Sequence, residues 1–197
     1  MNFKEFTKLV ESFEKPVILL EGSRNVSAKD ADSLTELAAK LAERFPQASF
    51  RSGGASGSDD LFAQGVWRVN RERMQLVLPK SRKTFAGETN QIFFDALPEN
   101  EQEEIFSLTE KASPDYKGLI DFYRKKKPGR IYYKTQFLLR DALKVCGSPI
   151  FQMKRADVGC FYVNSDKKGG GGTGHTIRVC ELLKTPVIEQ REWMKWL

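Results

Sequence analysis

The first 80 residues alternate between apolar positions at helical spacing and short, continuous apolar runs. Apolar positions have helical spacing over residues 2–14, 34–45 and 61–69. Short apolar runs occur at residues 17–20, in the segment that begins at residue 48, and at residues 74–79. A short run without polar positions is typical of a strand buried on both faces of a sheet. The order helix, strand, helix, strand, helix, strand therefore predicts a parallel sheet covered by helices on both sides.

Polar residues mark where these helices are expected to begin. Ser27 and Asp30 fit a capping box before the second helix, and Ser58 fits the N-cap position of the third. Pro16 and Pro46 follow the first and second helices and are expected to end them.

The second half of the chain continues the pattern after a charged interruption. Residues 80–130 are polar and charge-rich, and they predict a helical insertion without a core of its own. Beyond it, residues 131–146 and about 173–184 have helical spacing, 156–163 and 186–188 fit strands, and the last seven residues fit a short helix. We therefore expect one α/β domain over residues 1–197, with the insertion at about 80–130.

Three glycine-rich segments follow predicted strands. They are "EGSRN" at 21–25, "SGGASGSDD" at 52–60 and "KKGGGGTGHT" at 167–176. The carboxyl ends of parallel strands meet at one edge of a sheet, so the three loops should lie together where ligands of open α/β sheets bind. Helix N-termini present unpaired N–H groups there, and glycine allows a phosphate to approach the backbone closely.

The loops supply the candidate site residues. Candidate ligand-binding residues are Gly22, Ser23, Arg24, Gly53, Gly54, Ser58, Gly171, Gly172, Thr173, Gly174, His175, Thr176 and Arg178. Asp59 and Asp60 are candidate catalytic carboxylates. Structural roles stay open at this point: the glycines could only shape turns, the two aspartates could only favour the helix dipole, and the charged and imidazole side chains could be structural.

Charge and cysteine content limit the partners and the compartment. The formal net charge is +6, and the isoelectric point of about 9.2 is compatible with a phosphorylated ligand or nucleic acid. Cys146, Cys160 and Cys180 lack zinc-site spacing and stand in apolar surroundings, which favours reduced thiols. With no apolar run of about 18 residues and no signal-like start, we expect a cytoplasmic protein without membrane contact. No metal site and no cofactor are expected.

Gly22-Ser23-Arg24, the loop "SGGASGSD" and the segment "GGTGHTIR" at 171–178 together resemble the SLOG superfamily. This superfamily of Rossmann-like domains includes the DNA-uptake protein DprA and the cytokinin-activating LOG hydrolases. The resemblance covers roughly residues 16–79 and 131–189, and it is nearest to small uncharacterised bacterial and phage members. It implies a Rossmann-like three-layer fold with a mostly parallel sheet, and a nucleotide or nucleotide derivative held over the glycine-rich loops.

The sequence departs from the hydrolases at one position. Their pattern, Gly-Gly-x-Gly-Thr-x-x-Glu, is matched here through Thr173, but Thr176 occupies the glutamate position. Base removal from a nucleotide normally uses carboxylates, and Asp59, Asp60 or Glu21 would have to supply one.

Three functions therefore stay open. The first is nucleotide binding, and the second is cleavage of the N-glycosidic bond of a nucleoside 5′-monophosphate. The third is single-stranded DNA binding through the basic residues of 80–83 and 124–130, with Tyr132 and Tyr133 as stacking surfaces. A homo-oligomer is also expected. The aromatic termini (Phe3, Phe6, Trp193, Trp196) fit either a core or a subunit interface.

Overall fold

A computed structural model describes residues 1–80, 90–163 and 170–197, and its centre is a six-stranded, all-parallel sheet. The strand order is β4-β3-β2-β1-β5-β6. The strands are β1 (Val17–Gly22), β2 (Ser49–Ser52), β3 (Met74–Leu78), β4 (Gln91–Phe93), β5 (Val158–Tyr162) and β6 (Val187–Glu189). The predicted α/β fold with a parallel sheet is confirmed.

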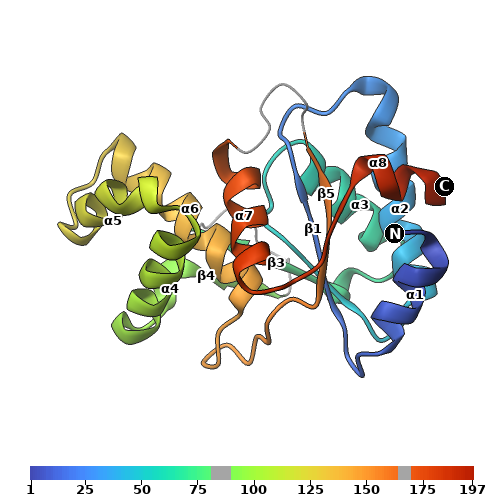
Figure 1. The fold of residues 1–197 in the computed structure, drawn as a ribbon, viewed down its shortest axis with the longest axis horizontal. Helices are drawn as coiled ribbons and strands as arrows, with labels where there is room; N and C mark the ends of the chain where they lie inside the picture. The colour runs from blue at the N-terminus through green and yellow to red at the C-terminus, as the bar shows by residue number, and fades with distance from the viewer. Residues whose placement is uncertain (81–89, 164–169) are drawn as a thin grey trace.

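Helices cover both faces of the sheet and make it the middle of three layers (Figure 1). One layer consists of α1 (Phe3–Glu11), α2 (Ala31–Arg44), α3 (Ser58–Val69) and α8 (Gln190–Trp193). The other consists of α4 (Glu99–Ala112), α5 (Lys117–Arg124), α6 (Arg130–Cys146) and α7 (Gly171–Leu182). Figure 1 shows α4 and α5 beyond α6, on the side away from α2 and α3.

Alternate residues of β1, β3 and β5 enter two hydrophobic clusters. In β1, Ile18 and Leu20 pack with α1, α2 and α3, whereas Val17 and Leu19 pack with the helices of the opposite layer. This two-sided burial explains the continuous apolar run of β1. The second cluster also contains Ile105 and Ile120 of α4 and α5, so the charged segment packs its apolar side chains onto the sheet layer.

The sheet changes direction at β1, and this positions the site. From β1 the chain proceeds through β2, β3 and β4 on one side, and it then returns to place β5 and β6 on the other. The loops after β1 and β5 consequently leave the sheet in opposite directions and open a crevice between them, the usual ligand position in such folds.

Several local predictions differ from the structure. α1 is shorter than predicted and begins with a capping box formed by Asn2 and Glu5. The predicted capping box at Ser27 is wrong, because its side chain makes no cap bond and Asp30 precedes α2 without one. Ser58 is the first residue of α3 rather than its cap; Gly57, at φ 90°, holds that position. The sequence analysis also missed β4, which lies inside the 80–130 segment.

The aromatic termini are part of the core of the chain itself. Phe6 and Trp193 have no exposed surface, and the rings of Phe6 and Trp196 lie 4.7 Å apart. Packing within the chain therefore buries Phe6, Trp193 and Trp196. No helix in the described ranges has the length and apolar character that crossing a bilayer requires.

Candidate functional site: a cavity at the carboxyl edge of the sheet

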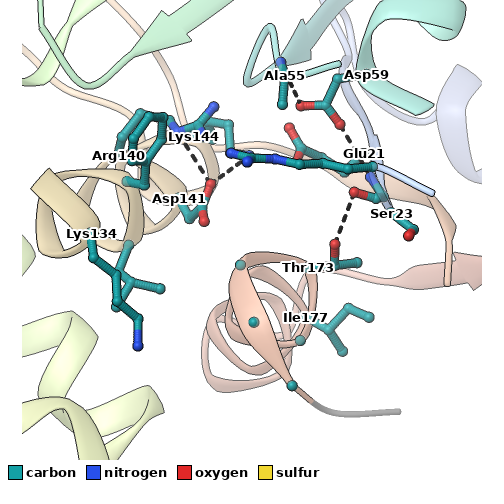
Figure 2. Close-up of a pocket in the computed structure, with 18 of the residues that line it drawn as sticks. Glu21, Ser23, Ala55, Asp59, Lys134, Arg140, Asp141, Lys144, Thr173 and Ile177 are labelled. Atoms are coloured by element: carbon teal, nitrogen blue, oxygen red, sulfur yellow. Dashed lines mark hydrogen bonds and ion pairs between the residues drawn. The ribbon is translucent and has the colours of Figure 1, made fainter. Parts of the chain in front are cut away.

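A cavity of about 830 Å³ lies where β1, β2 and β5 end. Its size is in the range of pockets for small molecules and cofactors. Three kinds of surface enclose it: the glycine-rich start of α7, the exposed first turns of α6, and a floor of buried charged side chains. Figure 2 shows Thr173 and Ile177 of α7 on one side and the charged side chains of the floor on the other.

About half of the predicted ligand-binding residues line the cavity, and so does the candidate catalytic residue Asp59. The predicted residues that line the cavity are Gly22, Ser23, Arg24, Asp59, Gly171, Gly172, Thr173 and Gly174. α7 begins at Gly171, where φ is 68° and the space around an added Cβ would be open. At Gly171 this wall therefore combines the N-terminus of a helix with backbone that no side chain covers, the arrangement that favours anions. At the next residue, Gly172, an added Cβ would lie 2.7 Å from a carboxylate oxygen of Asp141.

Thr173 and Thr176 do not offer their hydroxyl hydrogens to a ligand. Thr173 Oγ1 donates to the carbonyl of Gly22 at 2.9 Å and so joins α7 to the end of β1. Thr176 Oγ1 donates to the carbonyl of Gly172 at 3.0 Å, within its own helix. Both hydroxyls thus hold the glycine-rich turn in place.

The other predicted residues lie outside the cavity lining: Gly53, Gly54, Ser58, Asp60, His175, Thr176 and Arg178. Gly53 instead gives Arg140 room, because an added Cβ would lie 1.7 Å from a guanidinium nitrogen. Asp60 is exposed and accepts a hydrogen bond from Gln64 at 3.1 Å. Helix geometry separates the α7 residues: positions 173 and 177 share one face, and 175 faces nearly the opposite way.

The wall opposite α7 is cationic and aromatic. Arg24, Arg130 and Lys134 are exposed and line the cavity. Phe137 lies among them, with the guanidinium carbon of Arg24 5.8 Å from its ring centroid. An anionic group and a flat ring could both be accommodated here. Tyr116 and Arg130 bring the 80–130 segment to the cavity.

The floor is a buried network of five charged side chains: Glu21, Asp59, Arg140, Asp141 and Lys144. Lys144 Nζ bonds a Glu21 carboxylate oxygen and lies 2.8 Å from Asp141 Oδ1. Arg140 Nε lies 3.2 Å from the same Asp141 oxygen. Three carboxyl groups thus face two cations, and the network is neutral only when one carboxyl holds a proton.

Burial and charge together decide which group holds that proton. Burial, reinforced by the negative charge of Asp59, raises the pKa of Glu21 to about 8, although Lys144 acts against the shift. Burial also raises the pKa of Asp59. For Asp141 burial acts in the same direction, but Lys144 and Arg140 outweigh it and lower the pKa. The acids raise the pKa of Lys144 despite its burial, so this lysine stays charged.

Asp59, a predicted catalytic residue, holds two loops together. Its oxygens accept hydrogen bonds from the backbone N–H groups of Gly22 and Ala55, each at 3.3 Å. Gly22 is the last residue of β1 and Ala55 lies in the loop after β2, so the carboxylate ties both segments to the start of α3. Both oxygens are occupied in this role.

His175 faces away from the cavity and joins α7 to the 80–130 segment. Its Nδ1 lies 2.8 Å from Ser113 Oγ, to which Arg178 Nε also donates at 2.9 Å. The ring of Tyr116 packs edge-on against the imidazole at 5.4 Å. Burial lowers the pKa of His175 to about 4, with Arg178 and Lys144 adding to the effect and Asp141 opposing it. The imidazole is therefore neutral at pH 7.

We expect this buried histidine to make folding sensitive to acid. An unfolded histidine takes up a proton near pH 6.5, but the folded one does so only near pH 4, so stability is lost as the pH falls through this window. His175 should contribute a loss of about 2 kcal/mol in the free energy of unfolding between pH 7 and pH 5. This contribution is the difference between the native protein and His175→Gln, because Glu21, with its raised pKa, acts in the opposite direction in both. Urea unfolding of the native protein and of His175→Gln at both values measures it. Equal losses in the two proteins would contradict the prediction.

The sequence analysis did not identify the floor residues of α6. Arg140, Asp141 and Lys144 have the charges and spacing of an ordinary exposed helix face. One signal was available: Leu138, Leu139, Ala142 and Leu143 flank them, so apolar and charged residues occupy all sides of this part of the helix. A helix with apolar residues around it is buried, and its charges then need partners.

Comparison with known proteins identifies similar folds. No protein-family model matches the chain, and no curated protein matches it in sequence. A solved structure of the DNA processing protein A from Helicobacter pylori, described by its single-stranded DNA binding mode, has a TM-score of 0.52 and 15% identity over 93% of this chain and 67% of that one. The X-ray structure of TM1055 has a TM-score of 0.50 and 18% identity, over 88% of this chain and 72% of that one. At these identities the likeness is one of fold, and the chain has a Rossmann-like α/β fold with an all-parallel sheet.

Proposed function

We propose that this protein binds a nucleotide or nucleotide derivative in the cavity at the carboxyl edge of the sheet. One observation carries the proposal: the uncovered backbone at Gly171, where α7 begins, lines the same cavity of about 830 Å³ as the cations Arg24, Arg130 and Lys134. A phosphate meets N–H groups on one side and positive charge on the other. Phe137 and Tyr133 provide flat surfaces for a base.

Calorimetric titration with the four ribonucleoside 5′-monophosphates tests this proposal. We expect saturable binding of at least one of them to the wild-type protein. Lys134→Met should weaken that binding roughly fivefold, because an exposed lysine contributes about 1 kcal/mol to a phosphate contact. Thermal unfolding should be unchanged, since the side chain is exposed.

Lys4→Met is the matched control, because Lys4 is an exposed lysine of α1, in the layer of helices opposite α6 and α7. It should leave nucleotide affinity as in the wild type. Failure of all four nucleotides to bind would overturn the proposal, and so would equal weakening by both lysine variants.

A second candidate is single-stranded DNA binding at the cavity mouth. The favouring observation is the rim formed by Arg130, Tyr133 and Lys134, where Lys80 Nζ also lies 4.7 Å from the ring centroid of Tyr133. Of the predicted basic stretch 80–83, only Lys80 is among the described residues. A mobility shift of oligothymidylate at increasing salt tests this candidate, since phosphate contacts give a steep salt dependence. Binding that is insensitive to salt would exclude it.

Glycosidic cleavage has weaker support. Asp60 is exposed outside the cavity lining, and both oxygens of Asp59 accept backbone N–H groups. Glu21 remains as the carboxyl that could act as a general acid, because its pKa of about 8 keeps it protonated at neutral pH. Chromatography of each titrated sample for free base tests this activity directly.

A further inference from the structure

Glu21 leaves one polar atom unsatisfied at the floor of the cavity. It lies at the end of β1, lines the cavity and is 3% exposed. One carboxyl oxygen bonds Lys144, and the other, Oε1, has no hydrogen-bond partner in the structure. Burying a polar atom without a partner costs about 1–3 kcal/mol, so such atoms in native proteins usually have a role.

The neighbouring carboxyl groups are committed to protein partners. Asp59 accepts hydrogen bonds from two backbone N–H groups, and Asp141 Oδ1 forms ion pairs with both Lys144 and Arg140. Among the side chains of the described ranges, Glu21 Oε1 is the buried carboxyl oxygen that lacks any partner. A ligand that fills the cavity can supply a partner for this oxygen.

The chemistry of the floor selects the kind of group that fits there. A phosphate is disfavoured beside Glu21, Asp59 and Asp141, which together outnumber the two cations of the network. A hydroxyl can donate to an ionised carboxylate or accept from a protonated one, so it satisfies Oε1 in both states. The cavity is thus polarised, with positive groups at its mouth and a hydroxyl-binding floor.

We propose that Glu21 recognises a sugar hydroxyl of the ligand, so that the protein selects ribonucleotides over nucleotides lacking the 2′ and 3′ hydroxyls. The inference rests on the proposed nucleotide binding and adds a specificity-determining residue to it. The 5′-phosphate of such a ligand lies at the cationic mouth of the cavity, and the 2′ and 3′ hydroxyls of its ribose contact the floor. This role of Glu21 is one of binding and requires no chemical step.

The test compares ribonucleoside and 2′,3′-dideoxyribonucleoside 5′-monophosphates in calorimetric titrations. The wild type should bind the ribonucleotide about tenfold more tightly, because the dideoxy ligand leaves Oε1 buried without a partner at a cost of about 1–3 kcal/mol. Glu21→Met should reduce this preference to within about twofold. This variant leaves two acids facing two cations in the floor, so the network stays balanced. Glu21→Gln, which keeps a polar group, should retain part of the preference.

Asp60→Asn is the matched control, because it removes an exposed carboxylate one residue from Asp59 and outside the cavity lining. It should keep the wild-type preference. One contrary result is equal affinity of the wild type for both nucleotides while Lys134→Met still weakens the binding of each. That result would overturn the role of Glu21 and leave the proposed nucleotide binding intact. Full preference in Glu21→Met would overturn it as well. Absence of binding by every nucleotide would overturn the proposed function and this inference together.

Discussion

Replacing Lys144 with methionine should lower the free energy of unfolding by about 3–5 kcal/mol. The ammonium group of Lys144 contacts the carboxylates of Glu21 and Asp141, and its side chain is 1% exposed. Methionine has a similar length but no charge, so the variant leaves three carboxyl groups against Arg140 alone. Removing one partner of a buried ion pair is costly because the charge left behind cannot return to water.

Urea unfolding at pH 8 and pH 6 measures this effect and its pH dependence. The difference between the variant and the wild type should be larger at pH 8, because protons taken up by Glu21 and Asp59 at lower pH replace part of the missing charge. Lys134→Met on the same helix is the control, and it should change stability by less than about 0.5 kcal/mol. A loss of similar size in both variants would contradict the ionic explanation.

Gly22→Ala should destabilise the fold by about 1–3 kcal/mol. A Cβ at this position would lie 2.2 Å from the carbonyl oxygen of Tyr162 and 2.8 Å from Ser58 Oγ. The carbonyl belongs to β5, which pairs with β1 at this point, so the two strands would have to separate. Nucleotide affinity should fall as well, because Gly22 lines the cavity and its carbonyl holds Thr173.

Gly118→Ala provides the opposite expectation. Gly118 lies in α5, and an added Cβ would meet no atom within 4 Å. Alanine favours the helix by about 0.5–1 kcal/mol relative to glycine, so this variant should unfold at higher urea concentration than the wild type. If Gly22→Ala also raised the midpoint, the steric account of Gly22 would be wrong.

The strands and their order along the chain could be predicted because each is a short apolar run between polar or glycine-rich segments. Burial on both faces removes the alternation that would otherwise suggest a strand with one exposed face, as in β1. β4 could not be predicted in this way. It has three residues, and Gln91 interrupts its apolar character.

The glycine-rich loops could be located from the sequence, but the direction of individual side chains within them could not. Glycine frequency marks places where backbone is uncovered, and residues 171–174 do line the cavity. The phase of α7 is set by tertiary packing, which turns Ile177 toward the cavity and His175 toward Ser113. Hydroxyls such as that of Thr173 find backbone partners that only the folded loops bring near.

The floor of the cavity could not be predicted, because it depends on contacts far apart in the sequence. Lys144 and Glu21 are separated by 123 positions, and nothing local to either residue indicates the other. Charged residues are rarely buried, so sequence patterns assign them to the surface by default. Only the packing of α6 against β1, β2 and β3 brings these groups together.

The five-charge floor also restricts how this cavity can change during evolution. Losing Lys144 alone is strongly unfavourable, but a chain that has already lost Glu21 keeps one acid for each base and no longer needs an additional proton. Simultaneous replacement of a buried ion pair by apolar residues is often neutral, although each single step is not. Substitutions at Glu21 and Lys144 are therefore epistatic, and lineages that alter this floor should pass through loss of the acid before loss of the lysine.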